Sequence, residues 1–186
     1  KANMDTKDIL RIKRELTGDG EAIIYDWDKY YYENQLLLRK YNVDSKKVKE
    51  YFELNRVVDG FFNITELLFD LKYLKVENPS VWHEDVTMYK VIDRKDGKLI
   101  GRFYLDLYPR QNKYQHAAEF TIVGGKKIGD VYQIPVACLV CNFPKSGPIY
   151  PSLLTHDDVV TFFHEFGHLL HDMVSKTELM SQSGTS

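Results

Sequence analysis

The hydrophobic positions in the first eighty residues recur at helical spacing. Apolar side chains lie three and four positions apart, as they do along the buried face of an α-helix. Turn-forming and capping residues separate these runs. We therefore expect residues 1–80 to be helical, with helices from Asp5 or Thr6 to Gly18, from Trp27 to Tyr41, from Asp44 through Phe52, and from Arg56 to Leu74.

Between Trp82 and Phe143 the hydrophobic period changes from helical spacing to two, the period of half-buried strands. Asp96-Gly97 is typical of a hairpin turn, and Pro144 to Pro151 form a loop that neither helix nor strand can continue. The predicted class is α+β, predominantly helical, with a small sheet over residues 82–143 inserted among helices and a final helix over residues 155–175. The strands are expected at Val86 to Val91, Leu99 to Leu107, Ala118 to Val123 and Val131 to Phe143.

The final helix carries the residues that indicate chemistry. Thr155 and Asp158 have the spacing of a capping box, and the strongly apolar run that follows is expected to be buried. Inside the helix lie His164 and His168, four positions apart and hence on one face, with Glu165 next to the first. His171 is about 10 Å along a straight helix from His164, too far to share one ion.

Two imidazoles one turn apart can converge on a tetrahedral zinc ion, with His164 and His168 as ligands. Glu165 can then act as the catalytic base on a water molecule that zinc activates. The competing interpretation is that both histidines are packed core residues. We favour the metal site because a buried glutamate without a partner would be costly.

Composition and charge exclude several classes of partner. The 25 basic and 27 acidic residues are balanced and form no run of like charge, so we expect neither nucleic acid nor an anionic membrane as a partner. No apolar run is long enough to span a bilayer. The start at Lys1 is neither an initiator methionine nor a signal peptide, so we expect the chain to begin inside a longer protein.

Cys138 and Cys141 form a C-x-x-C motif that lies in a predicted strand. Residues three apart on a strand face opposite sides, and no second pair of cysteines is present to complete a four-thiolate zinc site. We expect two buried, reduced thiols, which favours a cytoplasmic location.

A longer pattern surrounds these motifs. The run His156 to His168 resembles the zinc helix of the thimet oligopeptidase, neurolysin and oligopeptidase A family of zinc metallopeptidases, with its saccharolysin-like members the most similar. The resemblance extends over essentially the whole chain. Its other parts are Trp82 to Val86, Phe103 to Arg110, Lys113-Tyr114, His116 to Ala118, Pro151 to Leu154 and Ser183 to Thr185.

The resemblance implies a zincin-like catalytic region beside a deep channel, which cleaves short oligopeptides internally. It also implies a third zinc ligand, a glutamate on a following helix, and oxyanion-stabilising groups further on. Glu178 falls too early to match that glutamate, and the chain stops at Ser186. We therefore expect residues 1–186 to be a partial catalytic domain that holds zinc weakly or not at all, is inactive alone, and self-associates through an exposed apolar patch.

Some alternatives stay open from the sequence. The strand from Val136 to Asn142 either presents its edge to a peptide substrate or is plain core. An inactive peptide-binding or interaction module that keeps the zinc helix as scaffold is the alternative to an enzyme, and a structural zinc domain is a weaker one. The cytoplasm is the expected location, with the mitochondrial intermembrane space as the alternative. The sequence indicates no particular peptide or cleavage position.

Overall fold

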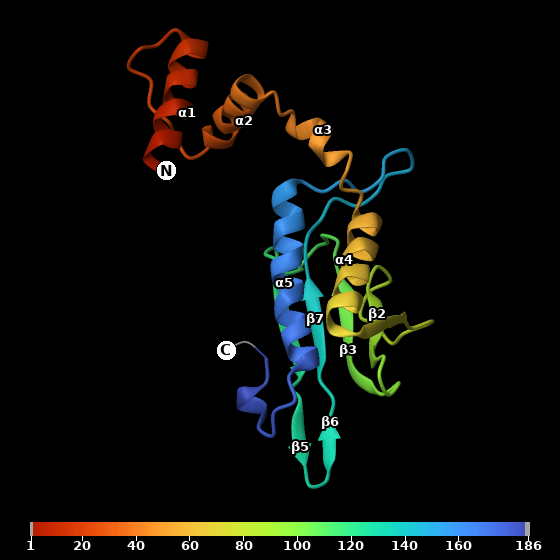
Figure 1. Cartoon of the computed structure of the whole chain (residues 1–186). Coiled ribbons are helices and arrows are strands. Elements are labelled where there is room, and N and C mark those ends of the chain that lie inside the picture. The colour runs from red at the N-terminus through yellow and green to blue at the C-terminus, as the bar shows by residue number, and fades with distance from the viewer. Residues whose placement is uncertain (1, 185–186) are drawn as a thin grey trace. The chain divides into compact units, whose positions relative to one another are not determined.

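The computed structural model describes residues 2–184, and for residues 2–5 the backbone alone. The chain divides into two compact units, Lys1–Tyr51 and Phe52–Ser186. Both contain helices, and the second also contains the sheets, so the predicted α+β class is confirmed (Figure 1).

The first unit is helical. A small apolar core joins α1 to α2, and Gly18 follows α1 in a left-handed conformation (φ 70°) that ends the helix. The helix α1 begins at Ala2, ahead of the predicted caps, and α3 ends at Lys49, before Phe52. The helices of this unit are α1 (Ala2–Thr17), α2 (Lys29–Tyr41) and α3 (Ser45–Lys49).

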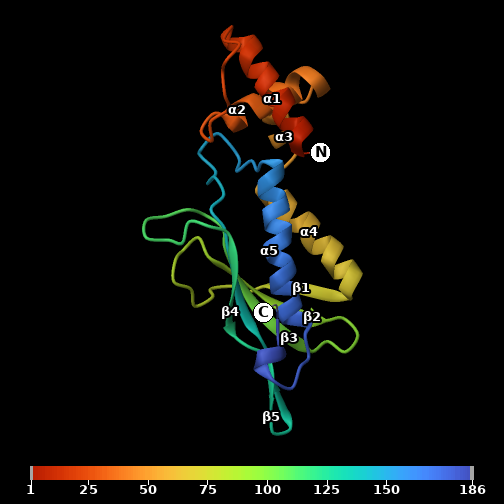
Figure 2. The same ribbon diagram turned by 90° about the vertical axis from the view of Figure 1, so that its left-hand side faces the viewer.

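The second unit is a mixed sheet with two helices on one of its faces (Figures 1 and 2). The five strands lie in the order β1-β2-β3-β7-β4, and β3 and β7 are the parallel pair. Phe166 of α5 packs against Phe62 of α4, Tyr73 of β1 and Phe103 of β3, so an aromatic core fills the space between helices and sheet. The elements are α4 (Leu54–Phe69), β1 (Leu71–Lys75), β2 (Thr87–Asp93), β3 (Leu99–Asp106), β4 (Ala118–Val123), β7 (Val136–Val140) and α5 (His156–Val174).

The predicted helix to Leu74 is wrong at its C-terminal end. The helix α4 stops at Phe69, Asp70 takes a left-handed conformation (φ 55°), and Leu71 begins the strand β1. Leu71 is in a strand because it pairs with Asp93 of β2. This partner strand is distant in sequence, so the local hydrophobic pattern could not predict the pairing. Two residues of the predicted buried face, Ile64 and Leu68, are exposed.

The predicted strand from Val131 to Phe143 is also divided. Its first part, β6 (Val131–Gln133), forms a separate two-stranded hairpin with β5 (Lys126–Ile128), which the sequence pattern did not reveal. Pro135 separates β6 from β7 because it has no N–H to donate to a sheet. The turn between β2 and β3 is confirmed, with Gly97 at φ 72°.

The strand β7 is interior, with β3 on one side and β4 on the other. It therefore has no free edge for a peptide, and its core interpretation is confirmed; the edge of the sheet on this side is β4. Cys138 and Cys141 are free and buried, as expected, and burial raises the pKa of both thiols to about 12. No helix among residues 2–184 has the length and apolar character needed to cross a bilayer.

Candidate metal centre

The helix α5 is fixed at its start and along one side. Thr155 Oγ1 accepts from the Asp158 N–H (3.0 Å) and Asp158 Oδ2 accepts from the Thr155 N–H (2.8 Å), which confirms the predicted capping box. Its buried side packs on the sheet and on α4, through Phe162, Phe166, Leu169, Leu170 and Met173. The opposite side is open, because Val160 and Phe163 are exposed rather than buried as predicted.

The two predicted ligands converge. His164 Nε2 and His168 Nε2 lie 3.2 Å apart, and their rings meet edge to face. Two nitrogens that each lie about 2.0–2.1 Å from a tetrahedral zinc ion would be roughly 3.3–3.4 Å apart. The side chains are on the outside of the helix and not in packed hydrocarbon, since His164 is exposed and His168 half-buried. The pair therefore fits two positions of a zinc site.

Glu165 lies between these histidines in sequence, and a hydrogen bond from the sheet holds its side chain in place. Its Oε2 accepts a hydrogen bond from the backbone N–H of Glu119 in β4 (3.1 Å). Because β4 is an edge strand, its amides that point away from β7 are free to make such a bond. The geometry gives this carboxylate one fixed donor beside the two imidazoles.

Two further acids accompany Glu165, and sequence reasoning missed both. Asp172, two turns later in α5, is 1% exposed and accepts from Thr121 Oγ1 of β4 (2.7 Å). Burial, together with the negative charges of Asp172 and Glu165, raises the pKa of Glu119 to about 7. An acid inside an apolar helix was the available signal for Asp172, but its partner strand could not be inferred locally.

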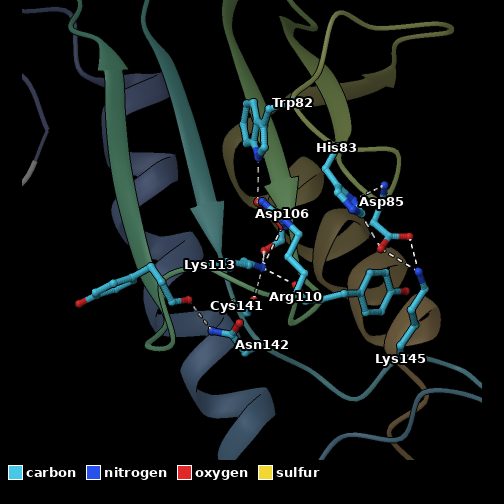
Figure 3. Close-up of polar contacts among 11 residues, drawn as sticks. Trp82, His83, Asp85, Asp106, Arg110, Lys113, Cys141, Asn142 and Lys145 are labelled. Atoms are coloured by element: carbon cyan, nitrogen blue, oxygen red, sulfur yellow. Dashed lines mark hydrogen bonds and ion pairs between the residues drawn. The ribbon is translucent and has the colours of Figure 1, made fainter.

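A second polar cluster lies where β3 ends (Figure 3). Asp106 is 2% exposed and receives two hydrogen bonds from Arg110 (2.6 and 2.7 Å) and one from Trp82 Nε1 (2.9 Å). Burial alone would raise the pKa of Asp106, but the hydrogen bonds from Arg110, Lys113 and Trp82 outweigh it and lower that pKa to about 2. This carboxylate stays ionised because it is well supplied with donors.

Lys113 joins this cluster to the end of β7. Its Nζ lies 2.8 Å from Asp106 Oδ1 and donates to the backbone carbonyls of Asp106, Tyr108 and Cys141. The carboxyl ends of parallel strands meet at one edge, so a single buried ammonium reaches the ends of both β3 and β7. The residues ahead of α5 that carried the resemblance thus hold the loop that leads into β4.

A complete metal site does not occur in the described part of the chain. Over residues 2–184, no three His, Cys, Asp or Glu side chains are grouped so that they could hold a metal ion. His171 is exposed and borders an apolar depression between α4 and α5, on another side of the helix from Glu165. Glu178 is 3.5 Å from Lys127, as part of an exposed ion pair.

Comparison with known proteins decides the family. The sequence profile of peptidase family M3 matches residues 1–186. The chain belongs to peptidase family M3. The resemblance drawn from the sequence motifs is therefore confirmed. The M3 chain folds into an α+β structure.

Several M3 relatives are similar over most of this chain. It is 47% identical to a thimet-like oligopeptidase of Dictyostelium discoideum over 87% of this chain and 24% of the relative. Saccharolysin of Saccharomyces cerevisiae is 42% identical over 89% of this chain and 24% of its own length. Oligopeptidase A of Escherichia coli is 37% identical over 90% and 25%. The chain thus spans about a quarter of the length of these relatives.

Proposed function

We propose that this chain is part of the catalytic region of a zinc metalloendopeptidase that hydrolyses short oligopeptides. The observation that carries the proposal is the approach of His164 Nε2 to His168 Nε2 (3.2 Å), beside a glutamate fixed by a backbone amide. Membership of family M3 and relatives named as oligopeptidases support it.

The donor set suits zinc. Two neutral imidazoles are typical zinc ligands, and the open side of α5 leaves both nitrogens accessible. We propose His164 and His168 as metal ligands and Glu165 as the catalytic base. A bound zinc ion would supply Lewis-acid chemistry, which makes water more acidic and polarises a peptide carbonyl.

The chain's own residues then handle protons and position. The carboxylate of Glu165 takes a proton from the attacking water and returns it to the leaving amine of the cleaved peptide bond. The Glu119 N–H donates to Oε2 of this carboxylate and so fixes its orientation beside the two imidazoles. Glu165 is half-buried, which limits competition from solvent.

The strand β4 is the best-placed element for a peptide backbone. In the part of the chain that the structure describes, it pairs with β7 alone, so its outer edge can accept another strand. The same strand donates the amide that holds Glu165. An extended peptide added to β4 would therefore lie beside the proposed base, which suits unstructured oligopeptides.

We further propose that the third ligand and the oxyanion-stabilising groups come from outside these 186 residues. Two imidazoles alone hold zinc weakly, so the chain by itself is expected to be inactive. The partners proposed are short peptides, with neither nucleic acid nor membrane. We place the protein in the cytoplasm, with the mitochondrial intermembrane space as the alternative, since one M3 relative is a mitochondrial intermediate peptidase of Yarrowia lipolytica.

The test is peptide hydrolysis by a full-length protein that contains this chain. A quenched fluorescent peptide of about ten residues should be cleaved internally, and Glu165→Gln should lower kcat by at least about 1000-fold while zinc content stays equal to that of the unmodified protein. A Glu178→Gln variant, in an exposed acid, is the control. Unchanged turnover in Glu165→Gln would contradict the role of Glu165 as the catalytic base. No cleavage by the unmodified full-length protein would favour the alternative of a binding module.

A further inference from the structure

Two hydrogen bonds tie the edge strand β4 to one side of α5. The Glu119 N–H donates to Glu165 Oε2 (3.1 Å), and Thr121 Oγ1 donates to Asp172 Oδ2 (2.7 Å). Glu165 and Asp172 are seven residues, about two turns, apart and so share one side of the helix. Glu119 and Thr121 are two residues apart in β4, where Glu119 uses its backbone N–H and Thr121 its side-chain hydroxyl. The two contacts therefore form one seam.

The position of Asp172 is not explained by general stability. Its side chain is buried, and none of the ion pairs among the described residues gives it a cation. Burying a carboxylate without a cation is costly, and its neutral donors, the Thr121 hydroxyl and the Glu119 carboxyl, offset only part of that cost. Gly184 closes the other side, because a Cβ at that position would lie 1.9 Å from Asp172 Oδ1. The carboxylate of Asp172 is thus confined between Gly184 on one side and the Thr121 hydroxyl on the other.

We propose that Thr121 and Asp172 are a positioning pair, which fixes β4 against α5 so that the Glu119 amide holds the carboxylate of Glu165 in its working orientation. The inference deepens the proposed function and rests on it. Neither side chain of the pair is a proposed metal ligand or the proposed base; both act through the amide of Glu119.

We expect disruption of this pair to lower turnover more than it weakens peptide binding. A general base must be held to within about 0.5 Å of its productive position, and a displacement of about 1 Å costs on the order of 100-fold in rate. When the Thr121 hydroxyl is removed, β4 loses one of the two hydrogen bonds that tie it to α5. We therefore expect kcat to fall by about 10- to 100-fold and KM to change by less than about threefold.

The experiment compares Thr121→Val, which has nearly the same shape but no hydroxyl, with Thr121→Ser, which keeps the hydroxyl. Both are made in a full-length protein that contains this chain and assayed on the peptide used above. Thr121→Val should show the fall in kcat, and Thr121→Ser should retain at least about half of the original value. Equal kcat in the original protein and Thr121→Val would overturn the proposal.

A second readout does not depend on activity. Hydrogen–deuterium exchange at the Glu119 amide, resolved by fragmentation in the mass spectrometer, should be at least about tenfold faster in Thr121→Val and unchanged in Thr121→Ser. Equal exchange rates of the Glu119 amide in Thr121→Val and Thr121→Ser would also overturn the proposed positioning pair. If Thr121→Val does not fold, Thr121→Ala removes the same hydroxyl and takes its place in both measurements.

These results separate the pair from the proposed function. If the unmodified protein cleaves no peptide, the proposed function fails, while the exchange at Glu119 still shows whether Thr121 holds the strand. If the protein cleaves peptide and Glu165→Gln abolishes cleavage, but Thr121→Val behaves as the original, the function stands and the pair fails.

Discussion

Glu119 is a side chain whose protonation depends on the fold. In the unfolded chain its carboxyl titrates near the ordinary value of 4.5, but in the folded protein burial and the neighbouring acids Asp172 and Glu165 raise the pKa to about 7. Between these two values the folded state binds more protons than the unfolded state. The stability contributed by this group therefore falls as the pH rises from about 4.5 to 7.

This sign gives the first prediction. Glu119→Gln removes the ionisable group but keeps the backbone N–H that Glu165 accepts from. The variant should match the original protein at pH 4.5 and be more stable by roughly 1 kcal/mol at pH 8, a value reduced to allow for solvent screening. The measurement is urea denaturation of metal-free protein at both pH values. Glu178→Gln is the control. If the free energy of unfolding changes with pH in Glu119→Gln as it does in the original protein, the assignment of this pH dependence to Glu119 is wrong.

The residues of the candidate site differ in how far the sequence could indicate them. The proposed residues His164, Glu165 and His168 could be singled out by spacing, because the helical period puts the two histidines on one face with Glu165 next to the first. Thr121 and Asp172 could not be paired in advance, because their contact depends on where β4 lies against α5. Local pattern carries the first kind of information and not the second.

At the scale of elements, the parallel pair β3 and β7 depends on one buried ammonium. Lys113 donates to three backbone carbonyls near the ends of these strands and forms an ion pair with the carboxylate of Asp106. The side chain of Lys113 is only 4% exposed, so water cannot replace these bonds. The loop that leads to β4 is anchored here.

We predict that Lys113→Met destabilises the protein by about 3 kcal/mol, since it leaves Asp106 and the three carbonyls short of donors in a buried place. Lys145→Met is the matched control: its ion pair with Asp85 involves a side chain that is 55% exposed, and its loss should destabilise the protein much less. The check is the free energy of unfolding in urea. Equal losses in the two variants would disprove the anchoring role of Lys113.

The element boundaries show where sequence patterns stop being informative. The capping box placed the start of α5 correctly because both of its partners are local. The end of α4 was misplaced because pairing with β2 draws Leu71 into a strand. The interior place of β7, which removes it as a substrate edge, is a property of strand order and not of its own residues.

At the scale of the whole molecule, the second unit leaves an apolar face uncovered. Ile64, Leu67 and Leu68 of α4 are 50%, 83% and 69% exposed, and Phe163 of α5 is 39% exposed. An apolar depression of about 500 Å³ lies between the two helices, lined by residues of this face. Contiguous exposed apolar surface of this kind favours association.

We therefore predict that the 186-residue chain self-associates through this face. Light scattering at about 50 μM should give a mass at least about twice 21.8 kDa, and Ile64→Glu should shift it toward the monomer. Ile128→Glu, in the hairpin β5–β6, is the matched control, because Ile128 is 54% exposed and lies outside this face. A monodisperse monomer of the original chain would contradict the prediction.

The proposed function depends on one zinc ion held by His164 and His168, with Glu165 beside it. Its most direct test is anomalous diffraction at the zinc edge from crystals of a full-length protein that contains this chain. We expect a single peak about 2.0–2.1 Å from Nε2 of both histidines. A peak bound elsewhere, or fully occupied zinc with either imidazole turned away, would contradict it.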